Sequence, residues 1–254
     1  MDYLLELEDV SIQFGGHTAV DRVSLQIPVN QFTSIAGPNG AGKTTLFNLI
    51  SGQLQPTTGK ILFKGKDITK LPPHKRTQLG LGRSFQITNV FPNLTVLENV
   101  RLAVQAQQQI GYKLLASNIL DKQQAEKATF WLEQVNLRYK TNDLAVTLTH
   151  GEKRKLEIAI ILALETDILL LDEPTAGMSI EEVPAILDLI MKIKAESQRT
   201  VLLIEHKMDM LMNLSEKLVI LNQGQLIAEG NPEEIMNNPI VQLAYLGGYN
   251  EQLA

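Results

Sequence analysis

The segment 37–44 constrains the fold of this chain more than any other part of its sequence. It reads Gly-Pro-Asn-Gly-Ala-Gly-Lys-Thr and fits the phosphate-binding pattern G-x-x-x-x-G-K-[ST]. The short apolar stretch 32–36 precedes it, and a helical pattern with one apolar face follows from Thr44. A chance glycine-rich turn would also contain these residue types, but it would not need a strand before it and a helix after it. We therefore predict a phosphate-binding loop between a strand and a helix.

The residue types in this loop match the chemistry of an anion site. Glycines let the backbone curl so that its N–H groups converge on phosphate oxygens, and the helix N-terminus adds partial positive charge. Lys43 can reach the outer phosphates, and the Thr44 hydroxyl can ligate magnesium. The predicted nucleotide contacts of this segment are Gly37, Pro38, Asn39, Gly40, Ala41, Gly42, Lys43, Thr44 and Thr45.

A second apolar strand, 168–171, ends in Asp172 and Glu173. A continuous apolar run of this kind is typical of a buried parallel strand. Ligands of open α/β sheets bind at the carboxyl ends of the strands, so both carboxylates are expected to face the phosphates. Asp172 is the predicted magnesium holder, and Glu173 is the predicted base that polarises the attacking water. An ordinary pair of solvated acids at a strand end is the alternative.

Two further residues follow predicted strands but carry less information by themselves. His206 comes after Glu205 at the end of the strand 201–204, which would place it near the γ-phosphate. A single histidine is more often structural. Gln86 follows Ser84 and Phe85 where the pattern changes to helical, and a single glutamine there has no meaning outside a wider pattern.

The alternation of elements predicts an α/β fold with a parallel sheet. Residues 4–27 alternate as antiparallel strands of a separate small sheet, and residues 218–228 form a hairpin that turns at 222–224. Helical signals dominate from 89 to 164, where Thr95 and Glu98 have the capping-box spacing. Two more helices are expected there, one with Ala128, Trp131, Leu132 and Val135 on a face, and one from Gly151 that buries Leu156, Ile160 and Leu164.

Composition excludes several classes of protein. The 254 residues include no cysteine, so disulfides and thiolate zinc sites are impossible, and the net charge of −5 argues against a broad nucleic-acid footprint. The N-terminus has no basic patch followed by an apolar stretch, so no secretion signal is expected. The longest apolar run, 158–164, is far shorter than the roughly 20 residues of a membrane helix. Work at a membrane would require docking to another chain.

These residues, in this order, resemble the ATP-binding cassette family over nearly the whole chain. The resemblance implies one nucleotide-binding domain, with a P-loop NTPase core in 1–88 and 165–254 and a helical subdomain in 89–164. It implies ATP and Mg²⁺ as cofactors, Glu173 as the catalytic carboxylate and His206 as the switch histidine. Gln86 is implied as a hinge glutamine that also reaches the metal, and Phe14 as the aromatic that stacks on adenine.

The family's signature segment usually reads LSGGQ, and here the sequence at that place is Leu148-Thr149-His150-Gly151-Glu152. Thr149 keeps a hydroxyl, and Gly151 with the helix N-terminus keeps the grip on an anion. His150 needs room, and Glu152 brings a carboxylate near the triphosphate unless it turns away. Thr149, Gly151 and Glu152 are the implied contacts to the partner's nucleotide. Ser179 stands where the family often has an aspartate in its dimer-contact loop.

The chain is similar in particular to ATPase subunits of importers for branched-chain and other hydrophobic amino acids. This similarity rests on the stretches 82–86, 91–100, 155–159 and 244–247. ATPases of urea and short-amide importers are near relatives and stay open as an alternative. So does a soluble ABC ATPase of ribosomes or DNA, although such proteins usually carry two cassettes or a long insert. An inactive regulatory cassette is disfavoured by the intact set Lys43, Asp172, Glu173 and His206.

The resemblance also implies partners. Two ATPs would lie in a head-to-tail dimer with a second copy or a paralogue, peripheral to the cytoplasmic face of the inner membrane. Transmembrane permease subunits would dock on the segment 87–99, just after the hinge, and a solute-binding protein would act indirectly. The alternative for 87–99 is an apolar loop packed on its own domain.

Overall fold

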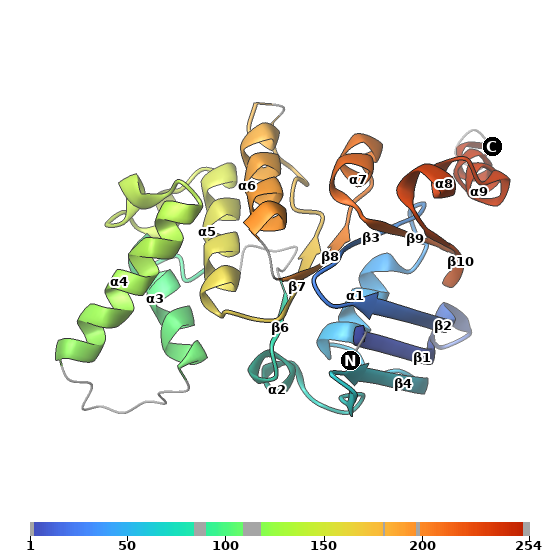
Figure 1. Ribbon diagram of the computed structural model, residues 1–254, viewed down its shortest axis with the longest axis horizontal. Coiled ribbons are helices and arrows are strands. Elements are labelled where there is room, and N and C mark those ends of the chain that lie inside the picture. Colours follow the sequence, from blue (N-terminus) through green and yellow to red (C-terminus); the bar gives the residue numbers. More distant parts are fainter. Residues whose placement is uncertain (1–2, 84–89, 109–117, 180, 197–198, 251–254) are drawn as a thin grey trace.

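The strands form two sheets in the computed structural model, which describes residues 3–83, 90–108, 118–179, 181–196 and 199–250 (Figure 1). The smaller sheet has the strand order β2-β1-β4-β5, and its neighbours are antiparallel. Its strands are β1 (Tyr3–Phe14), β2 (His17–Pro28), β4 (Thr58–Phe63) and β5 (Lys66–Asp67). The predicted N-terminal antiparallel sheet is therefore confirmed.

The larger sheet has the order β10-β9-β3-β8-β7-β6. All its pairs are parallel except β9 with β10, as expected for alternating strands and helices. Its strands are β3 (Phe32–Ala36), β6 (Leu81–Arg83), β7 (Ile168–Asp172), β8 (Thr200–Ile204), β9 (Lys217–Asn222) and β10 (Gln225–Gly230). The predicted mostly parallel core is present.

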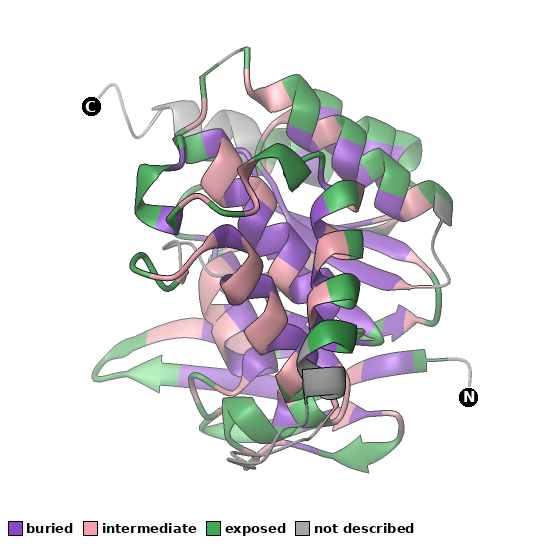
Figure 2. Cartoon of the chain, turned by 90° about the vertical axis from the view of Figure 1, so that its left-hand side faces the viewer, coloured by how far each residue is buried: buried purple, intermediate pink, exposed green. Residues whose placement is uncertain are grey.

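Both faces of the large sheet are buried, and alternate residues of a strand point to different cores. Leu169 and Leu171 of β7 pack with helices between Val96 and Glu196, whereas Ile168 and Leu170 pack with the helix Lys43–Ser51 and the small sheet. Burial on both faces explains why these strands read as continuous apolar runs without a polar alternation. Figure 2 shows buried residues through the interior and exposed residues on the outer helices.

The helices cover the two faces of the large sheet unequally. Helix α1 lies between the two sheets, and α6 and α7 cover the opposite face (Figure 1). Helices α3, α4 and α5 pack on one another at one end of the molecule, in the segment predicted to be helical. The helices are α1 (Lys43–Ser51), α2 (Pro73–Gln78), α3 (Val96–Gln107), α4 (Asn118–Gln134), α5 (His150–Ala163), α6 (Val183–Glu196), α7 (Met208–Leu214), α8 (Pro232–Met236) and α9 (Pro239–Asn250).

The helix caps differ in part from the prediction. Thr95 caps α3 by accepting a hydrogen bond from the Glu98 amide at 3.1 Å, but the Glu98 carboxylate accepts from Arg101. The expected spacing thus gives an N-cap in which the carboxylate binds a neighbouring guanidinium. In α5, Leu156 is fully buried, but Ile160 and Leu164 are only half-buried, because the helix presents other residues to the core, such as Ile158 and Ala159.

The hairpin of β9 and β10 turns as predicted. Gln223 and Gly224 both have positive φ, 47° and 80°, as a two-residue type I′ turn requires. The Gly224 amide donates to the Ala41 carbonyl at 3.1 Å, and the Asp21 amide donates to the Gly224 carbonyl at 2.9 Å. This turn therefore ties the small sheet to the loop 37–44.

Candidate active site

Three predicted site segments follow the carboxyl ends of three adjacent parallel strands. Strand β8 lies between β3 and β7, and Ile204 is in register with Ile35 on one side and with Asp172 on the other. The Glu173 amide also donates to the Ile204 carbonyl at 3.0 Å. The loop 37–44, the acidic pair 172–173 and the pair 205–206 therefore lie at the carboxyl ends of adjacent strands, along the side of the sheet that we call the sheet edge. Open α/β sheets bind ligands at this side.

The loop 37–44 curls tightly against the neighbouring backbone. Gly42 has a φ of 95°, and a Cβ there would lie 2.4 Å from the Ala19 carbonyl oxygen. Only glycine fits this position without a shift of the backbone. The Lys43 ammonium folds back and donates to the carbonyls of Gly37 at 2.7 Å and Pro38 at 2.9 Å. The segment 37–44 therefore forms a curled loop, and two of its own carbonyls hold the Lys43 side chain along it.

Lys43 lies in a buried but acidic setting. Burial lowers the pKa of its ammonium group, and the nearby carboxylates of Glu173 and Asp172 raise it in the opposite direction. These electrostatic contacts place the lysine of the loop and the acidic pair of β7 in one site. Thr44 and Thr45 lie half-buried in the first turn of α1, whose N-cap residue, Gly42, provides no side-chain cap.

Asp172 is fully buried and forms an ion pair with Arg83, whose Nη2 lies 3.1 Å from its Oδ2. Burial raises the pKa of this carboxyl, and Arg83 opposes that effect. Arg83 also donates to the Asn48 Oδ1 and Ser51 Oγ atoms of α1, both at 2.7 Å. Sequence reasoning did not assign Arg83, because no local spacing links it to partners 32 to 89 positions away.

The oxygen donors present fit a magnesium ion. Mg²⁺ prefers hard oxygen ligands and is usually held by one or two carboxylates together with substrate phosphates. Thr44 and Asp172 offer a hydroxyl and a carboxylate from segments that leave the same sheet edge. Among the described residues, no group of three or more His, Cys, Asp and Glu side chains could hold a metal by itself.

Glu173 stands at a strained turn. Its φ is 42°, a left-handed conformation that a residue with a Cβ rarely adopts. Such strain persists only where the surroundings enforce it, and it is frequent at functional sites. Its side chain is half-buried beside the loop 37–44.

The backbone of His206 is bound by the carboxylate of Glu205, which the sequence analysis did not assign to the site. Glu205 is fully buried and accepts the amides of His206 at 2.8 Å and Lys207 at 3.1 Å and the Thr175 hydroxyl at 2.8 Å. The His206 ring lies 3.5 Å from the same carboxylate, and its side chain is 54% exposed at the sheet edge. An exposed imidazole above an anchored backbone is free to meet a ligand.

The signature segment begins α5 with a full capping box. The Thr149 hydroxyl accepts the Glu152 amide at 3.2 Å, and the Glu152 carboxylate accepts the Thr149 amide at 2.9 Å. Tyr139 also donates to Glu152, at 2.7 Å. Burial alone would raise the pKa of Glu152, but these hydrogen bonds and Lys140 lower it overall. The carboxylate is therefore bound to its own helix cap.

Two other residues of this segment contact the loop after β7. The Gly151 amide donates to the Glu182 carboxylate at 3.2 Å, and a Cβ on Gly151 would lie 2.7 Å from the same oxygen. His150 finds room beside the loop, with its Nε2 atom 3.3 Å from the Ala176 carbonyl. Ser179 is exposed, and its amide points to Glu182 at 3.3 Å.

Phe14 ends β1 and is 48% exposed. It pairs with His17 across the turn, and the strand that follows passes the loop 37–44 at the contact of Ala19 with Gly42. An exposed ring near this loop is available for stacking on a flat ligand. Gln86 lies outside the described residues.

A family model for the ABC transporter matches residues 20–176, more than half of the chain. The chain belongs to the ABC transporter family. A second model, described as the branched-chain amino acid ATP-binding cassette transporter, matches residues 225–249 of this cassette. Cassettes of the family are ATPases that bind and hydrolyse ATP for transport, and the residues gathered at the sheet edge are of the type that this activity needs.

Curated relatives match the cassette over nearly its full length. The high-affinity branched-chain amino acid transport ATP-binding protein BraF of Pseudomonas aeruginosa is 41% identical, with 96% of this chain and 98% of BraF covered. The protein LivG of Escherichia coli, which has the same description, is 38% identical with the same coverage of both chains.

Solved structures agree with the fold. An ATP-binding cassette of an ABC transporter in its ADP conformation superposes with a TM-score of 0.82 at 30% identity, covering 97% of this chain and all of that one. A dimeric cassette in a post-hydrolysis state, bound to ADP and Pi, has a TM-score of 0.76 at 27% identity, with 90% and 98% covered.

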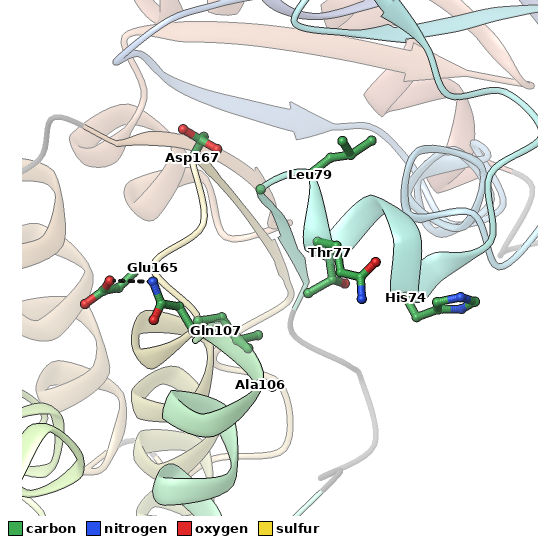
Figure 3. A pocket seen from close by; sticks show the side chains of 10 residues that line it. His74, Thr77, Leu79, Ala106, Gln107, Glu165 and Asp167 are labelled. Carbon is green, nitrogen blue, oxygen red and sulfur yellow. Dashed lines mark hydrogen bonds between the residues drawn. The ribbon is translucent and has the colours of Figure 1, made fainter. Parts of the chain in front are cut away.

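The ABC cassette has a hollow away from the loop 37–44. A cavity of about 510 Å³ opens between α2, the end of α3 and the segment before β7 (Figure 3). Gln107 donates to Glu165 at 3.0 Å on one wall, and Asp167 pairs with Lys64 at 2.7 Å.

Among the described residues, no helix is long and apolar enough to cross a membrane.

Proposed function

We propose that this chain is the ATP-hydrolysing subunit of an importer for branched-chain amino acids. The observation that carries the proposal is the 41% identity to BraF over 96% of the chain, supported by the tail model for branched-chain amino acid cassettes. Urea and short-amide import is the weaker alternative, because neither of these matches describes it. A soluble cassette acting on ribosomes or DNA is likewise not favoured.

In this proposal the loop 37–44 holds the phosphates of ATP. Backbone amides of the loop and the start of α1 bind the oxygens, and Lys43 exchanges its two carbonyl partners for the outer phosphates. Phe14 stacks on the adenine. Thr44 and Asp172 would hold Mg²⁺, and the ion would neutralise phosphate charge when bound. Gln86, which lies outside the described residues, is kept in the proposal as a further ligand of the ion.

Glu173 then acts as the general base. Its carboxylate orients the attacking water and takes up a proton, while Lys43 stabilises the negative charge on the phosphates. His206 extends from β8 at the same sheet edge, where it can contact the γ-phosphate and register its loss. The anchoring of its backbone by Glu205 keeps that edge in place during the cycle.

A second cassette, either a copy or a paralogue, completes each nucleotide site in our proposal. Thr149, Gly151 and the start of α5 would face the triphosphate of the partner in a head-to-tail dimer, and two-fold dimers are the commonest oligomers. The dimeric neighbour with bound ADP and Pi supports this arrangement. Gly151 would exchange the Glu182 carboxylate for a phosphate oxygen.

Permease subunits would receive the motion through the helical segment. We place their contact on residues 87–99, of which 90–99 are described, and Phe91 there is 58% exposed. A solute-binding protein would deliver the cargo to those permeases, and the cassette would sit at the cytoplasmic face of the membrane. The cassette itself does not touch the cargo.

Uptake of radiolabelled leucine and urea, in cells lacking this subunit, tests the proposal. Leucine uptake should fall and should return with the wild-type gene but not with Glu173→Gln. Urea uptake should not change. Loss of urea uptake with intact leucine uptake would overturn the cargo and leave the ATPase assignment in place.

A further inference from the structure

We propose that Arg154 is the positioning residue that holds the turn 172–174, and thereby aims the Glu173 carboxylate at the attacking water. The inference rests on the proposed role of Glu173 as the general base. Arg154 lies on α5, one turn after Gly151, and touches the backbone of the turn, so it acts on the reaction through the residues that it holds, and we assign its main effect to Glu173.

The guanidinium of Arg154 binds three consecutive carbonyls. Its Nε donates to Pro174 at 3.0 Å, and its Nη2 donates to Asp172 at 2.8 Å and Glu173 at 3.1 Å. Its Nη1 donates to the Glu157 carboxylate at 2.6 Å, and both side chains are less than a tenth exposed. A planar group with fixed donor directions imposes one geometry on the atoms it bonds.

The turn needs such support because Glu173 has a φ of 42°. This left-handed conformation costs energy in a residue with a Cβ, so the chain would relax without contacts on both sides. The Glu173 amide is fixed by the Ile204 carbonyl of β8, and the carbonyls on the other side are fixed by Arg154. Two clamps, one from the sheet and one from α5, thus set the direction of the side chain.

Helix α5 thereby serves two sites. Its first turn carries Thr149 and Gly151, which face the partner's nucleotide in the proposed dimer, and its second turn holds the base of its own site. A displacement of α5 on engaging the partner's phosphates moves the three carbonyls with it. Engagement of one nucleotide is therefore expected to adjust the base that cleaves the other.

The variant Arg154→Lys tests the inference in the full-length protein. A lysine keeps a cation beside Glu157 but presents a single ammonium, which cannot bond three carbonyls in one plane. Misplacement of a catalytic group by about 1 Å costs on the order of 10²-fold, so we expect kcat to fall on the order of 10- to 100-fold. Affinity for a fluorescent ATP analogue should not change. Arg101→Lys, the same exchange at a residue bonded to Glu98 and Gln124, is the matched control.

A double-mutant cycle with Glu173→Gln separates positioning from a general effect on the fold. Once the carboxylate is gone, Arg154→Lys should lower the residual turnover no further. If thermal melting shows that Arg154→Lys is not folded at the assay temperature, the double variant Arg154→Gln/Glu157→Gln is used in its place. That double variant removes both buried charges together. Normal kcat in the folded variant, or an additive loss in the cycle, would overturn the inference. Normal turnover of Glu173→Gln alone would instead refute the proposed base itself.

Discussion

Lys43 is buried and has two carboxylate neighbours, and both features affect the charge of its ammonium group. Burial lowers the pKa of its ammonium group, and Glu173 and Asp172 act against this, so the electrostatic field at the site depends on all three groups. Its bonds to the Gly37 and Pro38 carbonyls hold the side chain along the loop. A triphosphate offers stronger, charged acceptors at the same place.

Replacing Lys43 by alanine should weaken ATP binding without unfolding the protein. The variant loses charge-assisted hydrogen bonds to phosphate, each about 1.5–3 kcal/mol, so we expect affinity to fall at least tenfold. Fluorescent-nucleotide titration measures this directly, with Lys60→Ala on the exposed face of β4 as the control. Unchanged affinity together with unchanged turnover would remove Lys43 from the site.

Local patterns predicted the contiguous parts of the site, and long-range contacts escaped them. The loop 37–44 and the residues 172, 173 and 206 stand at the carboxyl ends of neighbouring parallel strands, as expected, and Lys43 lies near the two carboxylates. Arg83, Arg154 and Glu205 were missed, since each has partners that are distant in sequence, although Glu205 also binds the amides of its two neighbours. The roles of the predicted residues in catalysis stay predictions.

At the scale of elements, the Glu152 side chain at the start of α5 completes a capping box, although the resemblance implied that it contacts a nucleotide. The resemblance implied that Glu152 lies near a triphosphate unless its side chain turns away. The structure binds its carboxylate to the Thr149 amide and to the Tyr139 hydroxyl, 13 positions earlier. The sequence analysis recognised capping-box spacing only at Thr95 and Glu98, so the box at Thr149 and the tyrosine contact both come from the structure.

Glu152→Gln should reduce stability slightly at neutral pH, and the difference should vanish in acid. Glutamine keeps the box but loses the negative charge at the helix N-terminus, which is worth about 0.5 kcal/mol at a solvent-screened site. The folded-state pKa of Glu152 is lowered, so the stability it adds is present above the ordinary value of 4.5 and is lost as the pH falls through the lowered one. Urea unfolding of both proteins on either side of that pH measures the gap. A gap that is constant with pH would contradict the assignment.

Arg76 joins two elements that flank the nucleotide loop and the 510 Å³ cavity. It is fully buried on α2 and donates to the Leu49 and Ile50 carbonyls at the end of α1, and also to Thr69 and Leu71. Burial lowers its pKa to about 10, so it remains charged at neutral pH. A cation at a helix C-terminus also suits the helix dipole.

We expect Arg76→Met to destabilise the chain by on the order of 3 kcal/mol, because methionine fills the space but leaves four carbonyls without their donor. Chemical denaturation gives the value, and Arg76→Lys, which keeps the charge with fewer donors, should fall between the two. A loss below about 1 kcal/mol would mean that water replaces the guanidinium at little cost.

At the scale of the whole molecule, the periodicity of each segment sets where it is placed. Strands 4–27 alternate and form the antiparallel sheet, whereas the apolar runs 32–36, 168–171 and 201–204 lie buried in the parallel one. The helical stretch separates as α3, α4 and α5. The predicted face with Ala128, Trp131 and Leu132 does lie against the core, but the sequence did not show which helices it contacts.

Glu173→Gln should trap the proposed dimer. The amide keeps the shape of the side chain but loses the base, which typically costs about 10²–10⁴-fold in rate, so bound ATP persists between two copies. Light scattering with and without MgATP should show a shift from monomer to dimer, and Lys43→Ala combined with Glu173→Gln should abolish it. Dimers only with a paralogous cassette would indicate a heterodimer, and no ATP-dependent association with either would refute the proposed arrangement.

The order of strands in the large sheet has a consequence for biosynthesis. Strand β3 lies between β8 and β9, which follow it by more than 160 positions. During synthesis the loop 37–44 emerges before both strands that pair with β3, because those strands begin only at Thr200 and Lys217. Contacts so distant in sequence close slowly. The nascent chain therefore carries β3 with both edges unpaired until residues 200–222 have been made, and a chain truncated before residue 200 lacks both strands that pair with β3.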